Sequence, residues 1–420
     1  MSAVPAAAPR RFAALRNAEC RTYLIGAALA MMADNIEHVI TYWVLWERFH
    51  SPVLAGFQVI SHWLPFLLLS VPFGALADRF DCRRVIQAGQ LLFAAVSIAW
   101  GVFFATDSLT VVGACVLLVL HGTAGSLWGP AEQLMLHDFV GRGELSSAVR
   151  LNATFRSLGI LFGPVVGSAL LLGLGPEAGI FVNAAFYAPL ILFLLRTRYT
   201  GHLRDADTPR QRIGLLDSVR VLRYVRTEPT LLSMLVLAGL GSFFVGASLQ
   251  SVMPVFAGRL GAGESAGIAY GVLLFATGAG GVVGGVLLEA TNALRPTVRT
   301  AVVSTMIYGL AILGFAVTRS YLLAVILLFL GGAANLASMS ISQTVVQLLA
   351  PPAERGRVIG LYGVSANGLR LGSGFTVGFA GAALGVGASL AWSAAALCVG
   401  TLIAGAAAYR GRSARALEGS

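Results

Sequence analysis

Twelve apolar runs dominate this sequence, and each is long enough to cross a lipid bilayer as a helix of about 20 residues. They cover residues 22–46, 54–77, 85–105, 109–135, 146–172, 178–196, 230–256, 266–290, 298–317, 321–349, 357–384 and 388–409. Charged residues make up only 11% of the chain. A soluble protein carries about 25%, because its surface must stay hydrated. The sequence therefore predicts an all-α integral membrane protein.

The positive charges indicate how the chain is oriented. All 29 basic residues other than histidine are arginines. The ends and loops on one side of the predicted membrane carry 24 of them, whereas the opposite loops hold only Arg48, Arg259 and Arg319. Since cytoplasmic loops are enriched in positive charge, we expect both termini in the cytoplasm. Arginines at anionic headgroups explain the net charge of +10, so membrane lipids, and no nucleic acid, are expected partners.

Several classes of protein are disfavoured. The absence of lysine excludes a phosphate-loop lysine and a Schiff-base lysine. No H-E-x-x-H motif occurs, which argues against an intramembrane metalloprotease. The four cysteines are scattered, without the spacing of metal ligands or a disulfide framework. We expect no enzymatic activity, no cofactor, no resident metal and a monomer. Arginine in place of every lysine, with abundant alanine and glycine, resembles the coding bias of a GC-rich bacterium, which predicts the bacterial inner (plasma) membrane.

The order of the runs predicts two related halves. We expect a cytoplasmic tail at 1–21, a six-helix bundle at 22–196, a cytoplasmic linker at 197–229 with a short surface helix around Leu215–Tyr224, a second six-helix bundle at 230–409, and a tail at 410–420. A shift of 211 residues aligns Asp78, at the end of the second run, with Glu289, at the end of the eighth. The same shift aligns two pairs of glycines, Gly163 with Gly374 and Gly167 with Gly378. Such repeats are typical of transporters with the substrate site between the halves, near the middle of the bilayer.

Two motifs carry a family resemblance. Gly74-Ala-Leu-Ala-Asp78-Arg79-Phe-Asp-Cys-Arg83-Arg84 resembles the major facilitator signature between helices 2 and 3, and Gly159-Ile-Leu-Phe-Gly163-Pro164-Val-Val-Gly167 resembles its antiporter signature in helix 5. Four shorter stretches are similar to the exporter branch with macrolide and enterobactin efflux proteins: Pro130-Ala131, Glu144-Leu145, Leu151-Asn152 and Pro352–Val358. The resemblance implies twelve helices in two pseudo-symmetric bundles. It also implies an arginine in helix 4 that takes part in proton coupling, but Leu118 stands at that position.

The same motifs predict a gate at the cytoplasmic side. Asp78 ends a helix, where a carboxylate can pair with arginines or cap a neighbouring helix. A cluster of this kind can hold the two halves together in one conformation and release them in another. A glycine stripe at intervals of four permits close helix contact. The predicted gating residues are Gly74, Asp78, Arg79, Arg83, Arg84, Gly159, Gly163, Pro164 and Gly167.

Ionisable residues at mid-bilayer depth predict the binding site. Each ionised side chain there costs at least about 2.5–3.5 kcal/mol, so it is expected to face a polar interior and to have a partner. The candidate proton and substrate residues are Asp34, Glu37, His38, His62, His121, Arg156 and Arg370. The spacing i, i+3, i+4 puts Asp34, Glu37 and His38 on one helix face. We expect Arg156 to pair with Asp34 or Glu37.

These residues predict a proton-coupled exporter of a small amphipathic organic compound that works by alternating access, with Asp34 or Glu37 carrying the proton. A divalent metal exporter is one alternative, because Asp34, His38 and either His62 or His121 have suitable ligand chemistry. Against it, Arg156 at the same depth is expected to repel a cation. An uptake carrier or lipid flippase of the same fold is another alternative, since fold does not fix substrate or direction.

Overall fold

The computed structural model describes residues 11–205, 217–260, 266–292 and 294–418, and every regular element in them is helical. The first part of the chain forms α1 (Ala13–Arg16), α2 (Ala18–Phe49), α3 (Pro52–Arg79), α4 (Cys82–Ala105), α5 (Val111–Ala185) and α6 (Ala188–Arg196). Polar residues begin these helices. The side chains of Asn17, Ser51, Asp81 and Thr110 accept hydrogen bonds from the first free backbone amides of α2, α3, α4 and α5, respectively.

The second part follows a short segment that includes α7 (Asp217–Thr227). This helix confirms the predicted surface helix, although Leu215 and Leu216 lie outside the described residues. The remaining helices are α8 (Pro229–Phe244), α9 (Ser248–Arg259), α10 (Ala266–Thr291), α11 (Val298–Val317), α12 (Tyr321–Leu349), α13 (Arg355–Gly363), α14 (Arg370–Ser373), α15 (Ala380–Leu384) and α16 (Val386–Glu418).

The long element α5 contains more than one crossing. Its backbone leaves the helical region at Gly141, with φ of 72°, and at Gly175, with φ of 78°. Glycine has no β-carbon and adopts these left-handed angles at little cost. The two turns separate three helical stretches, which correspond to the predicted runs 109–135, 146–172 and 178–196 when α6 is included. The first stretch reaches Val140, five residues beyond its predicted end.

The predicted run 357–384 is the least regular of the twelve. Two π-helical turns, Val364–Gly368 and Gly374–Phe379, separate α13, α14 and α15. Glycines recur throughout this segment and favour a regular helix less than other residues do. π-turns inside helices are frequent at functional sites.

Eight described segments are long and apolar enough to be candidate membrane spans by length and composition, and one of them covers all of Val111–Arg196. Dividing that segment at its two glycine turns, and adding α2 and the broken segment α13–α15, gives the twelve crossings expected from the sequence.

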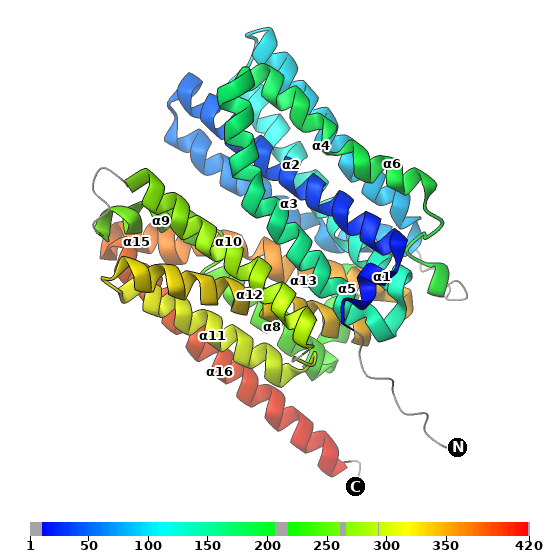
Figure 1. The fold of residues 1–420 in the computed structure, drawn as a ribbon. Coiled ribbons are helices and arrows are strands. Elements are labelled where there is room, and N and C mark those ends of the chain that lie inside the picture. The colour runs from blue at the N-terminus through cyan, green and yellow to red at the C-terminus, as the bar shows by residue number, and fades with distance from the viewer. Residues whose placement is uncertain (1–10, 206–216, 261–265, 293, 419–420) are drawn as a thin grey trace.

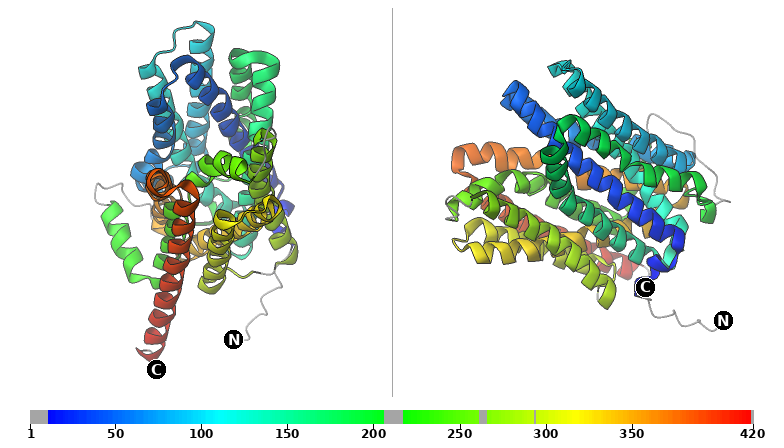
Figure 2. Two further views of the ribbon diagram at one scale, coloured as in Figure 1. Left: turned by 90° about the vertical axis from the view of Figure 1, so that its left-hand side faces the viewer. Right: turned by 45° about the horizontal axis from the view of Figure 1, so that its top comes forward.

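The helices form two bundles that lie against each other (Figure 1). Blue, cyan and green helices from α2 to α6 form one, and the helices from α8 to α16 form the other, while α1 and the last turns of α16 lie toward the same end. Figure 2 shows the same division from two further directions. Apolar side chains gather in separate cores: Tyr23, Phe93 and Phe139 belong to the first bundle, and Phe256 and Phe315 to the second. The exact boundaries at residues 196 and 230 stay predictions.

Candidate transport site and gate

A buried hydrogen-bonded unit of two carboxylates and a histidine lies inside the first bundle. Asp34 is at the middle of α2 and Glu37 is one turn further; they are only 7% and 2% exposed. His121, from α5, lies between them. Its Nε2 is 2.7 Å from Oδ1 of Asp34, and its Nδ1 is 2.8 Å from Oε1 of Glu37. Because ionised carboxylates only accept hydrogen bonds, both ring nitrogens carry hydrogen when both acids are ionised.

Two further histidines adjoin this carboxylate–histidine–carboxylate unit. The ring centroid of His38, on α2, is 4.9 Å from that of His62, on α3, and 4.9 Å from that of His121. One ligand atom from each of these three histidines and one from Asp34 all lie within 4.8 Å of one another. The structure thus brings together five of the seven residues predicted for the proton and substrate site, and they come from three helices.

A polar path supports Glu37 through the carboxylate oxygen that does not contact His121. The hydroxyl of Ser97, on α4, donates a hydrogen bond to Oε2 of Glu37. The amide of Asn183 donates in turn to the hydroxyl of Ser97, at 3.2 Å. Both residues are fully buried. They fix the carboxylate of Glu37 in place, and sequence analysis missed them because a single serine or asparagine in an apolar run carries no distinctive spacing.

The predicted partner of Arg156 was wrong. Its guanidinium lies 3.2 Å from Oε2 of Glu132 and 4.6 Å from the ring centroid of Trp128, not beside Asp34 or Glu37. Glu132 is 2% exposed. The predicted run stopped at 135 and put Glu132 near its end, but the helix continues to Val140 and places this acid well inside. An acid near the end of an apolar run was therefore the signal that sequence analysis overlooked.

Arg370 faces the first bundle from the second. Its guanidinium lies 4.5 Å from the ring centroid of Trp63, and Trp63 is 4.5 Å from the ring of His62. The Nε atom also donates to the carbonyl of Ala366, at 3.3 Å. Arg370 is thus separated from the histidine cluster by one indole ring, at the junction of the halves.

The predicted gate joins the two bundles at the arginine-rich end. Asp78 accepts hydrogen bonds from the backbone amides of Gly356 and Arg357, at 2.5 and 3.1 Å, and from Nη1 of Arg357, at 3.1 Å. It therefore caps the start of α13, which was one of the two predicted arrangements. The neighbouring arginines have other contacts: Arg83 pairs with Asp81 at 2.6 Å, Arg84 donates to Gln87 at 2.9 Å, and Arg79 lies over the ring of Phe80.

Glu289 makes the reciprocal contact, as the internal repeat suggests. It ends α10 in the second bundle and accepts from the hydroxyl of Ser147 and from Nε of Arg150, at 2.8 Å, in the first. The two acids that a shift of 211 residues relates therefore both bind the opposite half. The two glycine pairs related by the same shift do not make equivalent contacts. Gly163 and Gly167 pack closely against α2, whereas a β-carbon on Gly374 or Gly378 would have no atom within 4 Å.

Close backbone contacts accompany these ion pairs. A β-carbon on Gly74 would lie 2.2 Å from the carbonyl oxygen of Gly356, so α3 and α13 can approach this closely only with glycine at the crossing. Further bonds link the halves at this end: Gln347 donates to Gln133 at 2.7 Å, and Arg142 donates to the carbonyl of Leu348 at 2.8 Å. The arginine-rich end is closed in this structure.

The predicted glycine stripe of α5 packs against α2. β-Carbons at Gly159 and Gly163 would lie 2.6 Å from the carbonyl oxygen of Ala28 and 2.4 Å from Cβ of Asn35, and Gly167 faces Ile36. Pro164 lies within the same stretch of α5. The stripe therefore holds α5 close to the part of α2 that carries Asp34 and Glu37.

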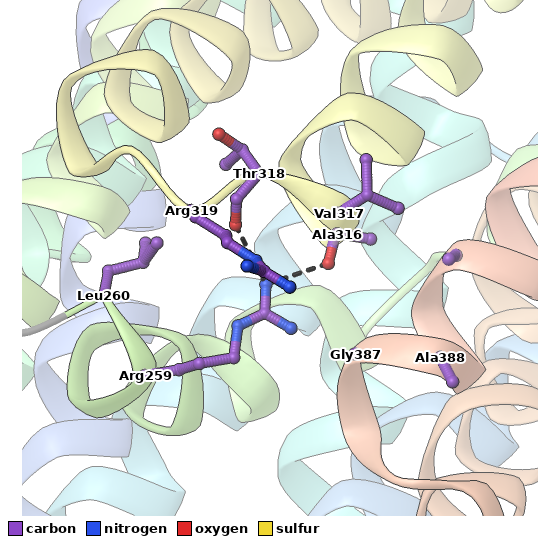
Figure 3. A pocket seen from close by; sticks show the side chains of 9 residues that line it. Arg259, Leu260, Ala316, Val317, Thr318, Arg319, Gly387 and Ala388 are labelled. Atoms are coloured by element: carbon purple, nitrogen blue, oxygen red, sulfur yellow. Dashed lines mark hydrogen bonds between the residues drawn. The ribbon is translucent and has the colours of Figure 1, made fainter.

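One pocket of about 470 Å³ opens at the end opposite the gate, between α9, α11 and α16 (Figure 3). There Nη2 of Arg259 donates to the carbonyl of Ala316 at 2.8 Å, and Arg319 and Gly387 line the same space. Binding the last carbonyls of a helix is a structural task for arginine. This pocket contains none of the predicted site residues.

Comparisons with known proteins agree with this architecture. The staphyloferrin A transporter of Staphylococcus aureus (strain NCTC 8325 / PS 47) is 21% identical over 84% of this chain and 87% of its own length. The multidrug efflux pump Tap of Mycolicibacterium fortuitum is 26% identical over 81% of this chain and 84% of its own. The chain spans about half the length, 51%, of another relative, the uncharacterized MFS-type transporter YfiS of Bacillus subtilis (strain 168), at 25% identity.

Solved structures show the same fold. The major facilitator superfamily transporter FucP, in the outward conformation, aligns with a TM-score of 0.73 and 14% identity, and the match covers 94% of this chain and 99% of FucP. A family model described as transmembrane secretion effector (MFS_3) matches residues 10–419, nearly the whole chain. The chain therefore belongs to the transmembrane secretion effector family of the major facilitator superfamily.

Proposed function

We propose that this transporter exports a small amphipathic organic compound, such as a drug, a siderophore or a secondary metabolite, in exchange for protons. The observation that carries the proposal is the buried unit of Asp34, His121 and Glu37, joined by hydrogen bonds of 2.7 and 2.8 Å. Export of an organic compound is supported by the names of two relatives, the staphyloferrin A transporter and the multidrug efflux pump Tap.

The charge of this unit explains how a proton acts on it. Two carboxylates and one imidazolium carry a net charge of −1, and one further proton on Asp34 or Glu37 makes the unit neutral. That proton also occupies a carboxylate oxygen that otherwise accepts a hydrogen bond. A cationic or hydrogen-bonding substrate and the proton therefore compete for the same acid, and this competition couples export to the proton gradient. His121 supplies the basic group in helix 4, where Leu118 replaces the arginine that the family resemblance implies.

Alternating access follows from the gate. Asp78 and Glu289 hold the arginine-rich end closed across the two bundles. If that end is cytoplasmic, as the 24-to-3 distribution of arginines predicts, the present conformation faces outward. Release of both contacts, together with closure at the opposite end, exposes the binding site to the cytoplasm.

A comparison of cells with and without the protein tests the substrate class. We expect higher tolerance of at least one compound in a panel of ethidium, tetracycline, a macrolide and a siderophore, with lower accumulation of that compound. The coupling is then measured in inverted membrane vesicles, where addition of the compound to the transporter dissipates a pre-formed proton gradient.

Two acidic variants test the proposed proton carrier. Asp34→Asn and Glu37→Gln keep the shape of each side chain but remove its acid function, so at least one of them is expected to abolish coupling. Asp107→Asn is the matched control, because Asp107 pairs with Arg48 at 2.7 Å in an exposed position away from the unit. Full gradient-driven activity in both unit variants would overturn the proposal.

A further inference from the structure

We propose that Asp34, His38, His62 and His121 form a binding site for one divalent transition-metal ion of the zinc class. Their candidate ligand atoms all lie within 4.8 Å of one another. Bonds of about 2.0–2.2 Å to nitrogen and oxygen place the ligands of a tetrahedral zinc ion about 3.4 Å apart. Small rotations of side chains that are already clustered therefore suffice to enclose the ion.

The position of His62 supports a ligand at the centre of the cluster. Its Nδ1 is buried and has no hydrogen-bond partner in the described part of the chain. A buried polar atom without a partner is unfavourable and requires an explanation. Its ring lies 4.9 Å from that of His38 and 5.6 Å from that of His121. A bound ion gives a ring nitrogen of His62 a partner, which the neighbouring rings of Trp63 and Phe66 do not.

Glu37 holds the ring of His121 in one orientation. In metal sites, a carboxylate that does not itself bind the metal often holds a metal-binding histidine in the same way. Histidines that bind metals usually donate their second ring N–H to a carboxylate or a carbonyl, which fixes the tautomer. Here Nδ1 of His121 lies 2.8 Å from Glu37, and Nε2 points toward Asp34 at 2.7 Å. On binding, the ion replaces the hydrogen between Nε2 and Asp34, and that proton leaves to water.

The acids in contact with the cluster offset the charge of a divalent cation, while the guanidinium of Arg370 lies beyond the ring of Trp63. Asp34 and Glu37 balance two positive charges when the histidines are neutral. Arg156, which the sequence suggested would repel a cation here, is paired with Glu132 instead. Three imidazoles and one carboxylate favour zinc and its neighbours in the first transition row over magnesium or calcium, which prefer oxygen ligands.

The site shares side chains with the proposed proton unit but does not depend on the proposed function. Binding of an ion needs neither a proton gradient nor an organic substrate, so it can be measured on purified protein in detergent. Zinc binding without proton-coupled export would refute the proposed function only, and proton-coupled export without zinc binding would refute this inference only.

The test uses the full chain after removal of metals with a chelator. We expect calorimetric titration with ZnCl₂ to give one site per chain, ZnCl₂ but not MgCl₂ to raise the melting temperature, and CoCl₂ to give the visible absorption of tetrahedral cobalt. His62→Leu is expected to weaken zinc binding at least about 100-fold, and Glu37→Gln, which alters an outer partner, about 10- to 100-fold. His38→Gln is a second ligand variant if His62→Leu does not fold.

His50→Asn is the matched control, because His50 ends α2 with a φ of 46°, an angle that asparagine tolerates, and lies outside the cluster. It is expected to bind zinc like the wild-type protein. The inference is overturned if the wild-type protein shows no zinc-specific site, or if folded His62→Leu or His38→Gln binds zinc as tightly as the wild type does.

Discussion

Replacing Asp78 by asparagine is expected to open the arginine-rich end of the transporter. The carboxylate of Asp78 is buried and accepts three hydrogen bonds from the start of α13, one of them from the guanidinium of Arg357. Asparagine offers a single acceptor oxygen and no charge, which removes the carboxylate that pairs with the buried Arg357 at 3.1 Å. Breaking one side of a buried ion pair costs about 3–5 kcal/mol. This corresponds to about 10²- to 4 × 10³-fold in the ratio of closed to open molecules.

Distances between spin labels measure this change directly. We would place labels at Arg84 in the first bundle and Arg299 in the second, both exposed at the arginine-rich end, in a variant without the four native cysteines. The wild-type protein should give one short distance. Asp78→Asn should add a longer distance, and because Glu289 still joins the halves, both populations are expected.

The control for this experiment is Asp81→Asn. Asp81 is only three residues away, but it pairs with Arg83 and caps α4 within its own bundle. It is expected to leave the distance distribution unchanged. The reasoning is refuted if Asp78→Asn gives the wild-type distribution, or if Asp81→Asn shifts it equally.

Two other substitutions test packing and charge in the membrane by thermal unfolding. Gly163→Ala is expected to lower the melting temperature, because its β-carbon would lie 2.4 Å from that of Asn35 and overpacking costs about 1–3 kcal/mol. Gly173→Ala, with no atom within 4 Å, should not lower it, and equal losses would contradict this account. Arg156→Gln leaves Glu132 buried and unpaired, so it should destabilise the protein more than the double variant Arg156→Gln/Glu132→Gln. A double variant as unstable as the single one would show that the pair does not matter.

Much of the fold follows from patterns that depend only on local sequence. The length and apolar composition of the runs located the membrane crossings. The unequal distribution of arginines between the two sides of the membrane distinguished the end at which the gate lies. The shared helix face of Asp34, Glu37 and His38 follows from a spacing of three and four residues. Counting residues from the start of each run also put His62 and His121 at a similar depth, and the structure brings all five together.

The partners of these residues could not be predicted in the same way. The depth of a residue along a helix does not tell which way the helix is rotated about its axis. Arg156 was therefore paired with Asp34 because the two lie at a similar depth, whereas its guanidinium points toward Glu132. Asp78 binds residues almost 280 positions later, and no local pattern encodes such a pairing. The π-turns beside Arg370 also depend on how glycine-rich helices pack, which composition alone does not specify.

The release of protons on substrate binding tests the central claim most directly. Purified transporter in weakly buffered detergent solution is mixed with the compound that the cell assay identifies, and a pH indicator records the protons released. If substrate and proton compete for Asp34 or Glu37, the wild-type protein and Asp107→Asn release protons in proportion to the compound bound. The variant Asp34→Asn/Glu37→Gln then releases none. Equal release by that variant, or binding to the wild-type protein without release at any pH, would contradict the account.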